Sequence, residues 1–269
     1  MPMINARNTL LLCLFFMPLH ANATIDAHKK GNMFVLWGWN NTHYENSDLH
    51  FKGENYDFTL KDVNATGEQS AISANDFLNP SNIGEPQSTF KVGYFSNDDY
   101  AISFGVDNFG CDFNENQLVT INGTINTGSD FDGTYQNDTI NAHQEGFLEF
   151  NHSTGLKYFN MEWTHFKTLY SFSNKLHVSG LAGLGAGVVT LKSQSTLLNK
   201  SPYGKLHFSG WGSTLKAGIE INYNGFFTRS EFKVGYLDLL HIRTSMNPSD
   251  KASQSFQYRQ FNILIGYYF

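Results

Sequence analysis

Residues 256–269, FQYRQFNILIGYYF, decide the fold. From Gln260 onward the residues alternate strictly between two faces. One face carries Phe261, Ile263, Ile265, Tyr267 and Phe269, and the other carries Gln260, Asn262, Leu264, Gly266 and Tyr268. A period of two residues predicts a β-strand, and the first face is apolar and aromatic throughout.

The composition extends this prediction to the whole chain. Aromatic residues make up 15% of the 269 residues and charged residues only 16%, which is unusual for a soluble domain. The mean hydropathy is −0.34, and no apolar run approaches the roughly 20 residues of a membrane-spanning helix. Alternating strands average out in hydropathy, so a transmembrane β-barrel remains compatible with these values.

The last strand resembles the closing strand of Gram-negative outer-membrane β-barrels, which typically end on phenylalanine, here Phe269. The resemblance implies an all-β, antiparallel up-and-down barrel in the cell outer membrane, with a porin-like strand pattern. It also implies that the barrel assembly machinery recognises the chain through Phe269. We expect residues 24–269 to form this single domain.

The first 23 residues have the pattern of a secretory signal peptide. Arg7 supplies the positive charge, residues 10–19 the apolar segment, and Ala21-Asn22-Ala23 the cleavage site, so we expect cleavage after Ala23. Cys111 is then the sole cysteine, which excludes an intramolecular disulfide.

Connection lengths predict the number of strands. Tight turns at 96–99, 171–174 and 223–225 alternate with long polar segments at 111–155, 193–206 and 239–255. Outer-membrane barrels have short periplasmic turns and long extracellular loops. The predicted strands are 32–44, 88–96, 99–110, 156–170, 176–192, 207–222, 226–238 and 256–269. Residues 45–87 become a large extracellular excursion, and ten strands is the alternative if an extra hairpin lies there or within 117–151.

The charged residues of these strands fall on the face that is not apolar. The inward set is Lys91, Lys216, Arg229 and Lys233 with Asp107, Glu162, Glu220 and Glu231. An eight-stranded barrel is just wide enough for its interior to be filled by side chains, and buried charges have to be paired. The sequence therefore predicts a lumen plugged by ion pairs, with Gly183, Gly185 and Gly187 leaving room for longer neighbours.

The most distinctive motif is NSDLHFKGENYDFTL at residues 46–60. Ser47, Asp48 and His50 are the residue types of a hydrolase site, although an extended strand points Ser47 away from the other two. The motif resembles the Ser-Asp-x-His-Phe-Lys-Gly-x-x-Tyr-Asp-Phe-Thr-Leu run that marks a family of small Gram-negative outer-membrane barrels. That resemblance continues at residues 92–95, 101–107 and 130–135, and it implies the fold and location but no activity. A structural cap, a ligand site and a catalytic site remain alternatives for the motif.

Two further features concern metals and surfaces. Asp130 and Asp132 stand beside Gly133 in an acidic segment, which is typical of either a divalent-cation site or a solvated loop. The histidines show no metal-ligand spacing, and a pI near 5.9 argues against nucleic acid. Trp37, Trp39, Trp163, Trp211, Tyr267 and Tyr268 are expected in interfacial girdles.

We therefore expect a non-enzymatic, monomeric barrel with no cofactor, in contact with outer-membrane lipid and lipopolysaccharide. It would act through its surface loops in envelope integrity or adhesion. One alternative is a lipid A- or phospholipid-modifying enzyme that uses Ser47, Asp48 and His50 near the outer leaflet. A second is the transport of small hydrophobic molecules.

Overall fold

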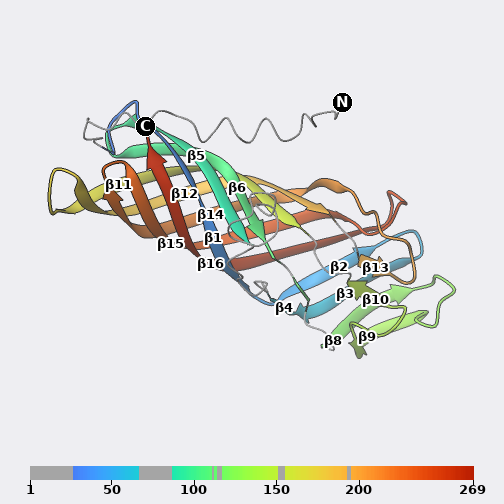
Figure 1. The fold of residues 1–269 in the computed structure, drawn as a ribbon. Helices are drawn as coiled ribbons and strands as arrows, with labels where there is room; N and C mark the ends of the chain where they lie inside the picture. The colour runs from blue at the N-terminus through green and yellow to red at the C-terminus, as the bar shows by residue number, and fades with distance from the viewer. Residues whose placement is uncertain (1–26, 67–86, 111, 114–116, 151–154, 193–194) are drawn as a thin grey trace, which may run out of the picture.

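Eight long strands close into a ring. The computed structural model describes residues 27–66, 87–110, 112–113, 117–150, 155–192 and 195–269. The predicted signal peptide (residues 1–23), residues 67–86 and Cys111 lie outside the described residues. The ring consists of β1 (Met33–Tyr44), β5 (Ser88–Asn97), β6 (Tyr100–Phe109), β11 (Leu156–Ser171), β12 (Leu176–Lys192), β14 (Leu206–Tyr223), β15 (Phe226–Arg243) and β16 (Lys251–Tyr268). Each strand pairs with the next, and β1 pairs with β16 from Phe34↔Tyr268 to Tyr44↔Tyr258 (Figure 1).

The ring confirms the eight-strand prediction, so the ten-strand alternative is wrong. The extra hairpins are present in both predicted segments, but they lie outside the ring. Within the part of the chain that the structure describes, no helix is long and apolar enough to span a membrane.

The tight turns gather at the end of the barrel where the chain terminates. Asn224 and Gly225, with φ of 50° and 92°, join β14 to β15 in the backbone conformation that hairpin turns of this kind require. Asp99, with φ of 63°, lies in the turn between β5 and β6. Short turns mark the periplasmic end, so the opposite end is extracellular.

Two ring strands are longer than predicted. β15 reaches Arg243 and β16 begins at Lys251, so the predicted long loop at 239–255 is reduced to 244–250. The register shifts between Leu239 and Ile242, after which Arg243 pairs with Lys251. This bulge breaks the alternation of β15, which is why the sequence pattern ended the strand too early.

A belt of apolar side chains faces outward around the ring. Phe261, Ile263 and Ile265 of β16 are 48%, 50% and 50% exposed, and the neighbouring residues on β14 and β15 continue the belt. Trp211 and Tyr236 lie together near its extracellular side, with ring centroids 6.0 Å apart. A continuous apolar surface on a closed sheet requires lipid around it. The protein is an integral β-barrel of the outer membrane.

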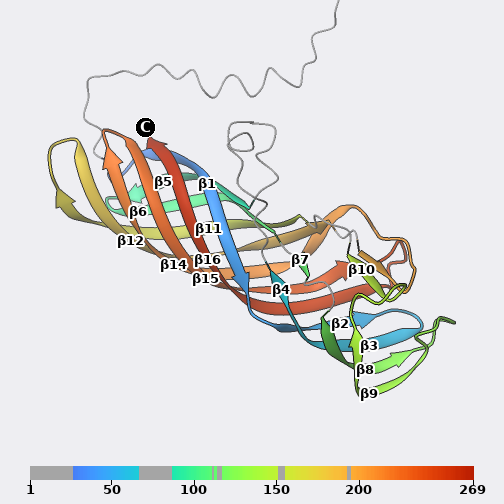
Figure 2. The ribbon, with the colours of Figure 1, turned by 60° about the horizontal axis from the view of Figure 1, so that its bottom comes forward.

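A second set of strands continues the sheet beyond the membrane. The order runs from β16 through β2 (Ser47–Lys52), β3 (Tyr56–Val63) and β8 (Leu118–Ile125) to β9 (Gly133–Asn141). The strands β10 (Leu148–Phe150) and β13 (Ser195–Leu197) form a separate pair. Short strands β4 (Ala65–Thr66) and β7 (Asp112–Phe113) join this region to β1. We call β2, β3, β8, β9, β10 and β13 the extracellular module (Figure 1 and Figure 2).

Candidate functional site

The middle of the lumen is filled by a network of ion pairs centred on Glu162 of β11. Its carboxylate accepts hydrogen bonds from the ammonium groups of Lys91 at 2.6 Å, Lys216 at 2.7 Å and Lys233 at 3.0 Å. Asp107 of β6 also accepts from Lys91 and Lys233, at 3.4 Å and 3.3 Å. All five side chains are buried. The predicted pairing of lumenal charges is therefore confirmed for this set.

A second part of the network lies around Glu220 of β14. Arg229 donates to Oε2 of Glu220 from Nε at 3.0 Å and from Nη2 at 2.7 Å. Its Nη1 lies 3.5 Å from Glu231, which also accepts from Lys216 at 3.1 Å. All eight charged residues predicted to face inward are thus joined in ion pairs. We call them the charged layer.

Around Glu220, two members of the network were missed from the sequence. His28 lies before β1, and its Nε2 is 3.0 Å from Oε1 of Glu220. The hydroxyl of Tyr268 donates to Glu220 at 2.8 Å. The prediction that Tyr268 belongs to an interfacial girdle is wrong, because it shares the inward face of β16 with Gln260. The alternation of β16 could have revealed this, whereas nothing in the sequence pairs His28 with Glu220.

Aromatic side chains close the lumen on both sides of the charged layer. On the periplasmic side, Phe34, Phe95, Phe166 and Phe227 are buried around Tyr268. The guanidinium of Arg229 lies over three of these rings, at 4.8–5.3 Å from their centroids. Cation–π contacts of this kind stabilise a desolvated cation. On the extracellular side, the lumen is closed by six large side chains: Tyr44, Phe109, Tyr158, Leu237, Phe256 and Tyr258.

Small residues on β12 make the space for the charged layer. A Cβ atom added to Gly185 would lie 2.8 Å from Cγ of Glu162, and one added to Gly183 would lie 3.2 Å from Cε of Lys216. These distances are shorter than ordinary contacts between carbon atoms. The expectation that glycines leave room for longer lumenal neighbours is confirmed at these two positions.

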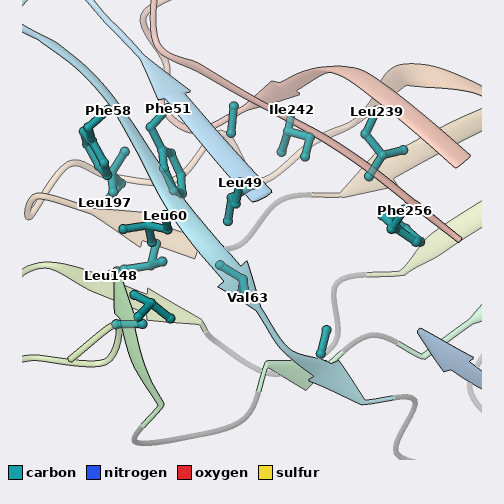
Figure 3. Packing of buried hydrophobic residues seen from close by; sticks show 14 of the residues in the cluster. Leu49, Phe51, Phe58, Leu60, Val63, Leu148, Leu197, Leu239, Ile242 and Phe256 are labelled. Atoms are coloured by element: carbon teal, nitrogen blue, oxygen red, sulfur yellow. The ribbon is translucent and has the colours of Figure 1, made fainter. Parts of the chain in front are cut away.

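The extracellular module has its own apolar core, which is continuous with the upper lumen. The rings of Phe51 on β2 and Phe58 on β3 stack with centroids 5.1 Å apart (Figure 3). The ring centroid of Phe147 lies 5.8 Å from that of Phe58. Leu49 and Leu60 are buried beside them. The same cluster includes Leu239, Ile242 and Phe256 of the ring strands. The apolar half of the 46–60 motif therefore lies in a cap over the extracellular mouth.

In the polar half of that motif, each candidate residue has a separate partner. Ser47 accepts a hydrogen bond from Gln254 at 2.9 Å, whereas Asp48 accepts one from Lys61 at 2.5 Å. His50 lies 2.7 Å from Asp57, which also accepts from Lys52 at 2.7 Å. The structure does not bring Ser47 and Asp48 together with His50. The buried carboxylate of Glu162 belongs to the lumenal network and not to this group of residues.

These exposed ion pairs affect the acidity of the motif. The hydrogen bonds from His50 and Lys52 hold the pKa of Asp57 below its usual value, and Lys61 does the same for Asp48. Burial raises the pKa of Tyr56 to about 12, because the phenolate would lack water. His50 and Asp57 form an exposed histidine–carboxylate pair.

The metal candidates lie in the turn between β8 and β9. The carboxylate of Asp132 accepts hydrogen bonds from the backbone amides of Thr127 at 2.8 Å, Gly128 at 2.8 Å and Ser129 at 3.2 Å. Both oxygens of Asp132 are thus used in closing the turn. Among the described residues, no group of three or more His, Cys, Asp or Glu residues could hold a metal ion.

Comparisons with known proteins find similarity in fold only. No family model matches the sequence, and the search of curated proteins finds no match. The outer membrane protein OprG from Pseudomonas aeruginosa shares 13% identity, with a TM-score of 0.44 over 91% of this chain and 99% of that chain. The attachment invasion locus protein Ail of Yersinia pestis shares 11%, with a TM-score of 0.33 over 89% and 99%. Neisserial surface protein A shares 10%, with a TM-score of 0.35 over 88% and 99%. These identities are too low to transfer an activity.

Proposed function

We propose that this protein is a non-conducting outer-membrane barrel that holds a binding module at the cell surface, where it works in adhesion or envelope integrity. Residues 46–60 form most of the β2–β3 hairpin of that module. The run resembles the marker of a family of small Gram-negative barrels, and we propose that the chain belongs with them.

The observation that carries the proposal is the continuity between the plugged lumen and the module core. The charged layer and the aromatic layers leave the interior filled with packed side chains. Above them, the buried cluster passes without a break from Phe256 of the ring to Phe58 of the module. Such packing holds the module in a fixed position on the barrel, which is what a surface-binding device needs.

The experiment uses cells that lack the protein and are complemented with variants. Phe58→Ala removes a buried ring at a cost of about 3–5 kcal/mol and should disorder the module without breaking the ring. Thr59→Ala changes the neighbouring position, which is on the outer face, and serves as the control. The measurements are the uptake of a hydrophobic fluorescent dye, as a test of the envelope barrier, and adherence to cultured host cells.

We expect Phe58→Ala to behave like the deletion in at least one measurement, and Thr59→Ala to behave like the wild type. The shift in gel mobility between folded and heat-unfolded barrel checks that the ring of each variant is intact. If the deletion strain matches the wild type in both dye uptake and adherence, the proposal is wrong.

The hydrogen bond between His50 and Asp57 favours a second candidate function, the enzymatic modification of lipid A or phospholipid. Its histidine and carboxylate could act as a base if a nucleophile were brought to them. His50→Ala should then change the lipid A mass spectrum of the cells. An unchanged spectrum would count decisively against this function.

A further inference from the structure

Three cations lie side by side across the junction between the barrel and the extracellular module. Arg243 of β15 pairs directly with Lys251 of β16, and Lys251 pairs directly with Lys52 of β2. Directly paired residues of antiparallel strands point to the same face, with Cβ atoms about 4.5–5.5 Å apart. We call these three residues the cationic row.

Like charges in direct opposition destabilise a sheet. Lys52 is offset by Asp57, but Lys251 makes no ion pair with any residue that the structure describes. Asp250 adjoins Lys251 in sequence, yet its carboxylate is buried and binds Lys200 at 2.9 Å and Ser245 at 2.7 Å. The middle of the row is therefore a cation between two cations.

Arg243 is held in place without a carboxylate. Its Nη2 donates to the carbonyl oxygen of Met246 at 3.1 Å, and the guanidinium lies 4.3 Å from the centroid of the Tyr203 ring. These contacts orient the group and leave its charge uncompensated. On the chain as a whole the formal net charge is −6, so this row is opposite in sign to the average surface.

Two other acids of the outward face already have partners. Asp238 accepts a hydrogen bond from Ser255 at 2.6 Å, and Glu45 pairs with Arg259. Ser253, directly opposite His50 on the same face, adds a hydroxyl donor beside the row. The unsatisfied positive charge and the neighbouring donor together fit an anion with several oxygens.

The position of the row indicates which anion would meet it. Odd-numbered residues of β16 face outward from Phe261, in the lipid-facing belt, to Lys251. Ten residues at about 3.3 Å each carry this face about 33 Å along the strand beyond Phe261, above the acyl chains. The neighbour of a wall at that level of an outer membrane is the phosphorylated saccharide of lipopolysaccharide.

We propose that the cationic row binds the phosphate groups of lipopolysaccharide core saccharide in the outer leaflet around the barrel. This inference rests on the proposed function and names a partner for the outward face of the module. Bound phosphate removes the repulsion across β15, β16 and β2, so the ligand also strengthens the junction between module and barrel.

The test is a calorimetric titration of the purified, folded protein with phosphorylated core oligosaccharide, the same oligosaccharide after dephosphorylation, and inorganic phosphate. Lys251→Gln is the main variant and Arg243→Gln the second. Lys175→Gln, an exposed lysine in a periplasmic turn, is the matched control. We expect Lys251→Gln to weaken binding of the phosphorylated oligosaccharide about five- to tenfold, the effect of one charge-assisted contact.

Three results would overturn the proposal. The first is equal affinity for the phosphorylated and dephosphorylated oligosaccharides. The second is wild-type affinity in both Lys251→Gln and Arg243→Gln. The third is binding of dextran sulfate without binding of the core oligosaccharide, which would assign the row to another polyanion. Inorganic phosphate should bind more weakly than the oligosaccharide.

The titration is independent of the cell assays. If the deletion strain shows normal dye uptake and adherence while the purified protein binds in a phosphate-dependent way, only the proposed function is wrong. If the deletion strain differs from the wild type but the purified protein shows no phosphate-dependent binding, only the proposed role of the cationic row is wrong.

Discussion

Glu162→Gln is the most informative perturbation of the lumen, because this carboxylate contacts three lysines. The substitution keeps the shape of the side chain but leaves the charged layer with one excess positive charge. Lys216 and Lys233 would retain their longer contacts with Glu231 and Asp107, and Lys91 would retain Asp107 and the amide oxygen of Asn160. Removing one partner of a buried ion pair costs about 3–5 kcal/mol. Because Glu162 is only 1% exposed, solvent does not reduce this estimate.

The assay is urea unfolding of the barrel in lipid vesicles, followed by tryptophan fluorescence. We expect the free energy of unfolding to fall by about 3–5 kcal/mol in Glu162→Gln. The exposed Glu145→Gln should change it by less than about 0.5 kcal/mol. Adding Lys216→Met to Glu162→Gln restores charge balance, so the double variant should lose less than the sum of the two single variants. A Glu162→Gln barrel as stable as the wild type would refute the ion-pair network.

Three further predictions concern other parts of the account. Gly185→Ala forces a methyl group against Glu162 and should cost about 1–3 kcal/mol in the same unfolding assay, whereas Gly180→Ala, which meets nothing closer than 3.5 Å, should be nearly neutral. Tyr268→Phe leaves the Glu220 network without one donor and should lower stability by about 1–3 kcal/mol, with no change in the slope of the urea transition. The depressed pKa of Asp57 means that its ion pairs stabilise the β2–β3 hairpin above the unfolded pKa and lose this effect as pH falls through the lower folded pKa. Because these side chains are about half exposed, the loss should stay below about 1 kcal/mol. The protection of the hairpin amides against hydrogen exchange, taken relative to the intrinsic exchange rate at each pH, should fall at pH 3, and should fall less in Asp57→Asn.

The ring could be predicted because its strands alternate between apolar and polar residues and its short turns contain characteristic residues. Lipid-facing charges are costly, so residues such as Lys216 and Glu220 could only point inward once the strand was recognised. The Asn224–Gly225 turn fixed the boundary between β14 and β15. These signals are local, which is why the ring strands were placed to within about two residues except where the bulge in β15 intervened.

The extracellular module was less predictable, because it depends on contacts between distant segments. The sequence of residues 51–63 is itself strand-like, but the pairing of residues 56–61 with residues 120–125 joins segments more than fifty residues apart. The same holds for the candidate site. His50 finds its carboxylate in Asp57 through the hairpin, and Asp132 is turned toward backbone amides that no motif specifies.

The most direct test of the central claim is the conductance of the purified protein in a planar lipid bilayer. A lumen filled by the charged layer between two aromatic layers should show no open steps of porin size, at any voltage that the bilayer tolerates. Regular steps of porin size from the folded wild-type protein would contradict the packing described here and remove the basis for a non-conducting barrel.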